Sequence, residues 1–130
     1  MSLPPLPALV TILALVLYQA TALLVGRARV QHHVKPPATT GPEGFERALR
    51  VQQNTLEQLV FFLPAFWMAV ALNQAGVACA LGFVWIGARI AYAVGYMQAP
   101  DKRGPGFGIA FLVSVALLVM AFVGVVAQLG

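Results

Sequence analysis

Residues 45–72 read FERALRVQQNTLEQLVFFLPAFWMAVAL, a stretch that is polar in its first half and apolar in its second. It is long enough to cross a bilayer, which needs about 20 mostly apolar residues. Four polar side chains follow one another in it at spacings of 3, 4 and 3: Arg47, Arg50, Asn54 and Glu57. At about 100° per residue they fall within roughly 80° of arc. They predict a membrane-spanning helix with one polar face, about 15 Å long.

Three further stretches are long and apolar enough to span a membrane. They are residues 6–26, 77–97 and 107–128. The segments between them carry the proline, glycine and charge that are typical of loops and turns: residues 27–44, 73–76 and 99–106. The sequence therefore predicts an all-α integral membrane protein, a four-transmembrane-helix bundle whose single domain covers residues 1–130.

The composition excludes other classes of protein. Of the 130 residues 60% are hydrophobic and only 9% are charged, whereas about a quarter of an average soluble domain is charged. The single cysteine excludes a disulfide framework within the chain, and His32 and His33 lack a third ligand, so we expect no metal site. The net charge of +4 is too scattered for a nucleic-acid surface.

The basic residues predict the orientation in the membrane. Of the eight, seven lie near one membrane face: Arg27, Arg29, Lys35, Arg47, Arg50, Lys102 and Arg103. Short cytoplasmic loops carry an excess of Lys and Arg, so both termini are expected on the non-cytoplasmic side. Because no basic residue precedes the first span, we do not expect it to be a cleaved signal peptide.

The third span adds a second polar face, with Arg89, Tyr92 and Tyr96 at spacings of 3 and 4. Ionisable residues inside a span are costly and usually functional. Four arginines are expected to face one buried acid, Glu57: Arg47, Arg50, Arg89 and Arg103. Such a surplus favours a small polyanionic ligand over a purely lipidic one. An internal ion pair of Glu57 with Arg50 or Arg89, fixing helix register, is the alternative for either pair alone.

Small residues four apart form another stripe in the third span, at Gly87, Ala91 and Gly95. Such stripes let helix backbones approach closely, so we expect this face to pack tightly while the opposite face lines a polar cleft. Four helices close two polar faces poorly within one chain. An oligomer with the cleft at a subunit boundary is therefore expected.

Two segments carry a resemblance to a known family. Residues 36–42, PPATTGP, and 45–57, FERALRVQQNTLE, resemble the loop and second helix of the MAPEG superfamily, the membrane-associated proteins in eicosanoid and glutathione metabolism. The nearest likeness is to its leukotriene C synthase and microsomal glutathione transferase branches. That family's third helix and following loop place their counterparts at Arg89, Tyr92, Tyr96 and Arg103.

The resemblance implies a homotrimer in a bacterial inner membrane or the endoplasmic reticulum, with glutathione as co-substrate between neighbouring subunits. It implies a glutathione transferase acting on lipophilic electrophiles, and it leaves open a peroxidase activity toward lipid hydroperoxides. Gln58 stands where the eicosanoid-conjugating enzyme has tyrosine. The implied glutathione-binding residues are Arg29, Arg50, Gln52, Gln53, Asn54, Glu57, Gln58, Tyr92, Tyr96 and Arg103.

Arg103 is the expected catalytic residue. A thiol with a pKa near 8.5 is mostly protonated at neutral pH, and an adjacent guanidinium favours the nucleophilic thiolate. The alternative is that Arg103 belongs only to a charged cytoplasmic turn. In the eicosanoid-conjugating enzyme the first helix ends in two arginines, the second with a proton-transfer role. Because Val30 follows Arg29 here, that role is vacant or passes to Arg27 or Arg29.

Two other functions are alternatives to a transferase. A non-catalytic lipid-binding scaffold resembling five-lipoxygenase-activating protein would need no glutathione, and the retention of Arg50, Asn54 and Glu57 argues against it. A four-helix drug exporter resembles this chain in length, but that class uses an acid in its first helix, and residues 6–26 contain none.

Overall fold

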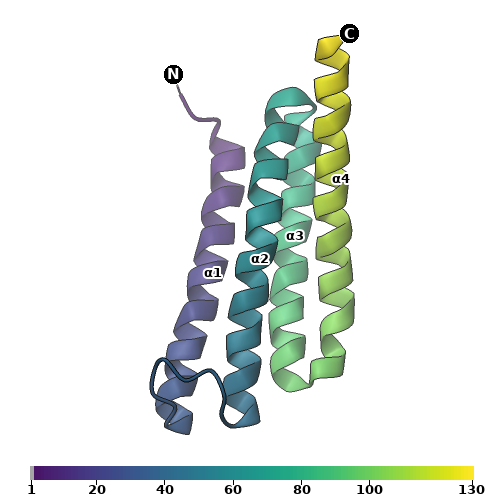
Figure 1. Ribbon diagram of the computed structural model, residues 1–130. Coiled ribbons are helices and arrows are strands. Elements are labelled where there is room, and N and C mark those ends of the chain that lie inside the picture. The colour runs from purple at the N-terminus through teal and green to yellow at the C-terminus, as the bar shows by residue number, and fades with distance from the viewer. Residues whose placement is uncertain (1) are drawn as a thin grey trace.

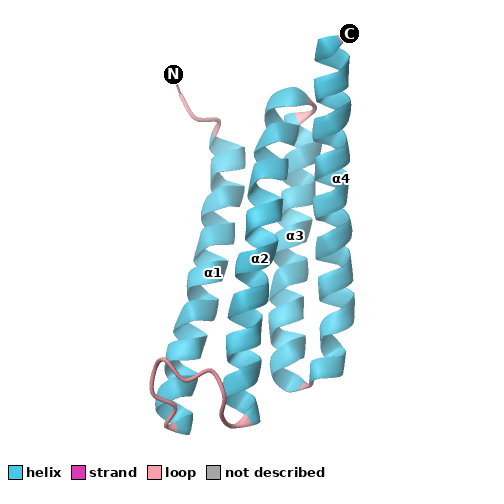
Figure 2. Ribbon diagram, viewed as in Figure 1, coloured by secondary structure: helices cyan, strands magenta, loops and turns pink. Residues whose placement is uncertain are grey.

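The computed structural model describes residues 2–130, which form four long helices and one short one (Figure 1). The helices are α1 (Pro5–His32), α2 (Glu43–Leu72), α3 (Ala75–Gln98), the 3-10 helix η1 (Pro100–Arg103) and α4 (Gly104–Leu129). Within residues 2–130 the remaining backbone is loop, with no strand (Figure 2). All four long helices are long and apolar enough to cross a membrane. The predicted all-α, four-helix membrane fold is confirmed.

The helices run alternately up and down because their connections are short. Both termini and the α2–α3 turn lie at one end of the bundle (Figure 1). The loop of residues 33–42 and η1 lie at the other end, which we call the basic end because Lys35, Lys102 and Arg103 belong to it. Helices α2 and α3 each pack against the other three long helices, so together they form the centre of the bundle.

Helix α1 is longer than the sequence predicted. We expected a span ending at Gly26 and a loop from Arg27, but the helix continues to His32. Hydropathy marks where the apolar stretch ends, and nothing between Arg27 and His32 breaks a helix. The helix stops at His33, which is left-handed (φ 56°) and donates its backbone N–H to the carbonyl of Arg29.

The core takes residues from all four long helices, and an aromatic stack lies within it between α2 and α3. The rings of Phe62 and Trp85 stack with centroids 4.0 Å apart and an interplanar angle of 8°, and Phe66 packs beside Phe62. All three side chains are fully buried. This stack holds α2 and α3 in register, and it thereby sets the positions of the polar residues that both helices carry toward the basic end.

Two residues of the predicted small-residue stripe, Gly87 and Ala91, form no close helix contact within the chain, while the third, Gly95, lies against η1. A Cβ atom on Gly87 would meet nothing within 4 Å, and Ala91 is exposed. Between the long helices, the close backbone approaches belong to α4 instead. A Cβ on Gly106 would lie 2.5 Å from the backbone nitrogen of Tyr92, and one on Gly124 would lie 2.2 Å from the carbonyl oxygen of Leu72. Small residues alone did not reveal which side of α3 faces a neighbour.

Candidate functional site

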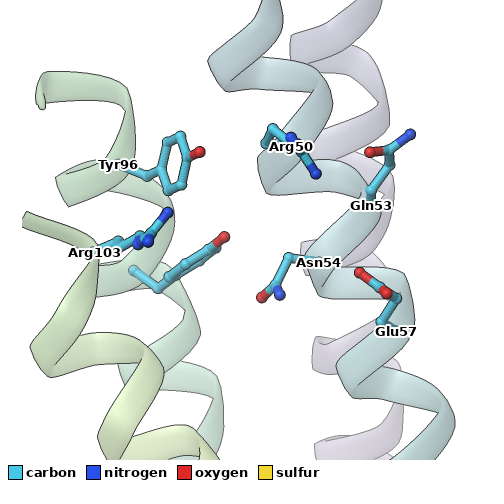
Figure 3. A pocket seen from close by; sticks show the side chains of 7 residues that line it. Arg50, Gln53, Asn54, Glu57, Tyr96 and Arg103 are labelled. Atoms are coloured by element: carbon cyan, nitrogen blue, oxygen red, sulfur yellow. The ribbon is translucent and has the colours of Figure 1, made fainter. Parts of the chain in front are cut away.

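A polar pocket of about 240 Å³ opens near the basic end, between α2 and the α3–η1 segment (Figure 3). Seven side chains line it: Arg50, Gln53, Asn54, Glu57, Tyr92, Tyr96 and Arg103. All seven belong to the site predicted from the sequence. A single chain brings them together, although the sequence favoured a cleft at a subunit boundary.

Helix α2 supplies one wall of the pocket, with a cation, two amides and an acid. Arg50, Gln53, Asn54 and Glu57 project from one face of the helix because they are 3, 1 and 3 residues apart (Figure 3). Glu57 was expected to be buried, but its side chain is exposed in the single chain. The wall therefore offers both charge signs to whatever enters the pocket.

The opposite wall is made by the end of α3 and by η1. Tyr92 is buried (3% exposed) and Tyr96 half-buried, with ring centroids 5.7 Å apart. The guanidinium carbon of Arg103 lies 5.7 Å from the centre of the Tyr96 ring, a cation–π distance. Figure 3 shows Tyr96 and Arg103 facing the polar side chains of α2. A guanidinium is thus held opposite Arg50 and Glu57.

Arg89 does not line the pocket but lies behind it. Its side chain is buried (1% exposed), and its Nη1 donates to Asn54 Oδ1 at 2.9 Å. Its Nη2 donates to the Thr55 hydroxyl at 2.9 Å, and its guanidinium carbon lies 4.1 Å from the Tyr92 ring centre. Among residues 2–130, neither Arg89 nor Arg50 forms a salt bridge with Glu57, so the alternative of an internal ion pair is wrong.

The side chain of Arg47 also bonds groups within the protein and does not line the pocket. It donates to the carbonyl oxygens of Met97 (3.2 Å) and Gln98 (3.0 Å) and pairs with Glu43. The expectation that four arginines face the acid is therefore wrong, since only Arg50 and Arg103 line the pocket. Two guanidiniums and one carboxylate leave the lining with a net positive charge.

Three predicted site residues lie away from this pocket. The guanidinium of Arg29 donates to the carbonyl of Ala38 at 2.9 Å and lies 4.8 Å from the Phe45 ring centre, so it braces the loop of residues 33–42. Gln52 and Gln58 are half-buried on α2 and line no part of the pocket. In a single chain these three residues do not join the other seven.

Thr55 is the residue near the site that the sequence did not indicate. Its hydroxyl donates to the carbonyl of Val51 at 2.7 Å and accepts from Arg89. A threonine that bonds the preceding turn of its own helix is common, because the hydroxyl satisfies itself locally. The sequence spacing therefore does not single out Thr55. Its hydroxyl is relevant to the site only because it accepts a hydrogen bond from Arg89 of α3.

Comparison with known proteins assigns the family. Residues 7–123 match the MAPEG family. An uncharacterised protein of Synechocystis sp. is 51% identical over 123 residues, which are 95% of this chain and 90% of that protein. Microsomal glutathione S-transferase 2 of Mus musculus is 45% identical over 105 residues, covering 80% of this chain and 71% of that protein.

Leukotriene C4 synthase of Cavia porcellus is 40% identical over 96 residues, which are 74% of this chain and 64% of that protein. The protein described here belongs to the MAPEG family and is a multi-pass membrane protein. The resemblance seen in residues 36–57 is confirmed and extends over most of the chain.

Proposed function

We propose that this protein is a membrane-bound glutathione transferase that conjugates the thiolate of glutathione to lipophilic electrophiles. The observation that carries the proposal is the pocket lining: two guanidiniums, one carboxylate and two amides around one opening. Glutathione carries two carboxylates, one ammonium and two peptide bonds, which match those groups in kind. The similarity to proteins named microsomal glutathione S-transferase 2 and leukotriene C4 synthase supports the same ligand.

Each lining group has a role in this proposal. Glu57 takes the glutamyl ammonium, and Arg50 takes a carboxylate through charge-assisted hydrogen bonds. Gln53 and Asn54 bond the peptide groups, while Tyr92 and Tyr96 close the side toward Arg103. Gln52, Gln58 and Arg29 are proposed to reach the ligand only from outside this single-chain pocket, through a neighbouring subunit.

We further propose that the working form is a homotrimer. The pocket of about 240 Å³ is smaller than the roughly 300–1,000 Å³ usual for ligand sites, so one chain encloses only part of a tripeptide. Arg50, Gln53 and Glu57 are exposed on the surface of the single chain. Ionisable groups facing lipid are costly, and a neighbouring subunit would cover them.

The chemistry proposed for Arg103 is thiolate stabilisation. The thiol loses its proton to solvent, and the guanidinium of Arg103 stabilises the anion that remains. The sulfur then forms a bond to the electrophilic carbon as the bond from that carbon to the leaving group breaks. A halide departs as the free anion, whereas the oxygen of an opened epoxide takes up a proton from water. Lipophilic electrophiles would reach the site from the bilayer, and both termini would face away from the cytoplasm.

Glutathione-dependent reduction of lipid hydroperoxides is a finer proposal on the same thiolate. Two glutathione molecules would be oxidised to their disulfide while the hydroperoxide is reduced to an alcohol and water. Comparing conjugation of an alkyl halide with reduction of cumene hydroperoxide, both by the purified protein, separates the two activities. Loss of both in one variant of Arg103 would assign them to a single thiolate.

The test is glutathione binding to the detergent-purified protein by equilibrium dialysis, with the ultraviolet absorbance of the thiolate read on the same samples. We expect Arg103→Ala to lose the thiolate signal at saturating glutathione and Arg50→Ala to lose affinity. Lys35→Ala removes a cation of the same membrane face that lies outside the pocket, and it should change neither. No binding at millimolar glutathione would reject the transferase and favour the lipid-binding scaffold.

A further inference from the structure

Arg89 is a charged side chain deep inside the bundle that no carboxylate neutralises. It lies nine residues before the end of α3, about 14 Å from that end along the helix axis. Its side chain is 1% exposed, and among the described residues 2–130 it takes part in no salt bridge. Burying an unpaired charge opposes folding. The stability of the helix bundle therefore gives no reason for an arginine here.

The contacts of Arg89 point toward the pocket instead. One of its nitrogens donates to Asn54, and the face of its guanidinium lies against the ring of Tyr92. Both of these residues line the pocket. The second nitrogen bonds Thr55, the neighbour of Asn54 in α2. Arg89 thus connects the two walls of the pocket from behind, without reaching the opening itself.

The bond to Asn54 fixes what that amide can offer. An asparagine side chain has one accepting oxygen and one donating NH₂ group, and an arginine can only donate. The atom of Asn54 that faces Arg89 must therefore be Oδ1, at 2.9 Å from Nη1. Only the NH₂ group is left for the pocket. Without Arg89 the amide could turn over and present its oxygen, which would repel a ligand carboxylate, carbonyl or thiolate.

We propose that Arg89 is a positioning residue, which holds Asn54 so that its amide N–H groups point at an anionic or carbonyl oxygen, or the thiolate, of the bound ligand. The ligand is glutathione, so this inference rests on the proposed function. Arg89 acts through Asn54 and does not touch the ligand. The contact with Tyr92 keeps the guanidinium plane in the orientation that the Asn54 bond needs.

Arg89→Leu separates positioning from a structural role. The Thr55 hydroxyl keeps its bond to the carbonyl of Val51, and Asn54 borders an open pocket where water can replace the lost partner. No buried group is stranded, and a buried charge is removed. We expect the thermal midpoint to stay the same or rise while the Kd for glutathione increases at least tenfold. A structural role predicts that affinity and thermal midpoint fall together.

The action through Asn54 is tested by a double-mutant cycle. Asn54→Ala alone should weaken glutathione binding, and Arg89→Leu combined with Asn54→Ala should bind within twofold of Asn54→Ala. Losses that multiply would overturn the inference, because Arg89 would then act independently of Asn54. Arg89→Lys keeps the charge but not the paired geometry, so we expect an intermediate Kd. If Arg89→Leu does not fold, Arg89→Lys can replace it in the double-mutant cycle with Asn54→Ala.

The outcomes separate this inference from the function on which it rests. If the wild-type protein does not bind glutathione, the proposed function fails and the inference fails with it. If the wild-type protein binds and Arg89→Leu binds equally well, only the inference fails. Lys35→Ala serves as the matched loss of one positive charge at the basic end and should leave the Kd unchanged.

Discussion

Gly95 lies directly against the backbone of Lys102: a Cβ atom on Gly95 would be 2.6 Å from the Lys102 carbonyl oxygen. That contact lets η1 close onto the end of α3, and Arg103 is the next residue after Lys102. The last glycine of the expected packing stripe therefore has another role. It positions the turn that presents the proposed catalytic arginine.

Gly95→Ala is expected to displace η1, because the Lys102 carbonyl is backbone and cannot rotate aside as a side chain would. A misplacement of about 1 Å at a reacting group can cost roughly a hundredfold in rate, so we expect conjugation to fall about ten- to a hundredfold. The measurement is thiolate absorbance and conjugation rate at saturating glutathione. Gly87→Ala, where the new methyl meets nothing within 4 Å, is the control; equal rates in both variants would show that η1 has room to shift.

Gly106→Ala is expected to destabilise the protein by about 1–3 kcal/mol, the usual cost of overpacking. The new methyl group would lie 2.5 Å from the backbone nitrogen of Tyr92 and 2.6 Å from the carbonyl oxygen of Ala88, so α3 and α4 would have to separate. Thermal unfolding of the variant and the wild-type protein in detergent measures this loss of stability. Gly108→Ala, two residues further along α4 with nothing within 4 Å, should be neutral or stabilising by up to about 1 kcal/mol; a loss of stability there would contradict the argument.

Arg47→Ala is expected to lower the free energy of unfolding by about 1.5–3 kcal/mol, the range for hydrogen bonds to a charged group. It removes the donors to the carbonyl oxygens of Met97 and Gln98 in the last turn of α3. Glu43→Gln removes only the partner of an exposed ion pair and should cost less than about 1 kcal/mol. Equal losses in the two variants would mean that the ion pair, not the capping of α3, matters.

Trp67→Phe is expected to cost about 0.6 kcal/mol, the average for a hydrogen bond between membrane helices. The Trp67 indole nitrogen donates to the Thr11 hydroxyl at 3.0 Å and links α2 to α1. Thr11→Val should remove the same bond, so the double variant should lose no more than the larger single loss. Chemical unfolding of the four proteins in one detergent gives the coupling; fully additive losses would rule out the bond as a stabilising contact.

The sequence predicted the residues that line the pocket, but it did not predict the hydrogen-bond partners of the two arginines beside it, Arg47 and Arg89. The seven lining residues were all predicted, but on two grounds. Spacings of three or four place Arg50, Asn54, Glu57, Tyr92 and Tyr96 on two helix faces. Gln53 and Arg103 were expected from the resemblance to the MAPEG superfamily. The partners of Arg47 and Arg89 could not be predicted. Both bond atoms about 34 to 51 residues away in the chain, and such contacts depend on how two helices are rotated about their own axes.

What the sequence determined by itself was the membrane class, the four spans and the identity of the polar face on α2. Those properties follow from hydropathy and from helical periodicity, which act within one segment. The tertiary structure alone decided that Gly106, not Gly87, makes the close helix contact, and that Arg89 lies behind the pocket instead of in it. The physical reason is that packing selects one rotation for each helix, and no single segment contains that information.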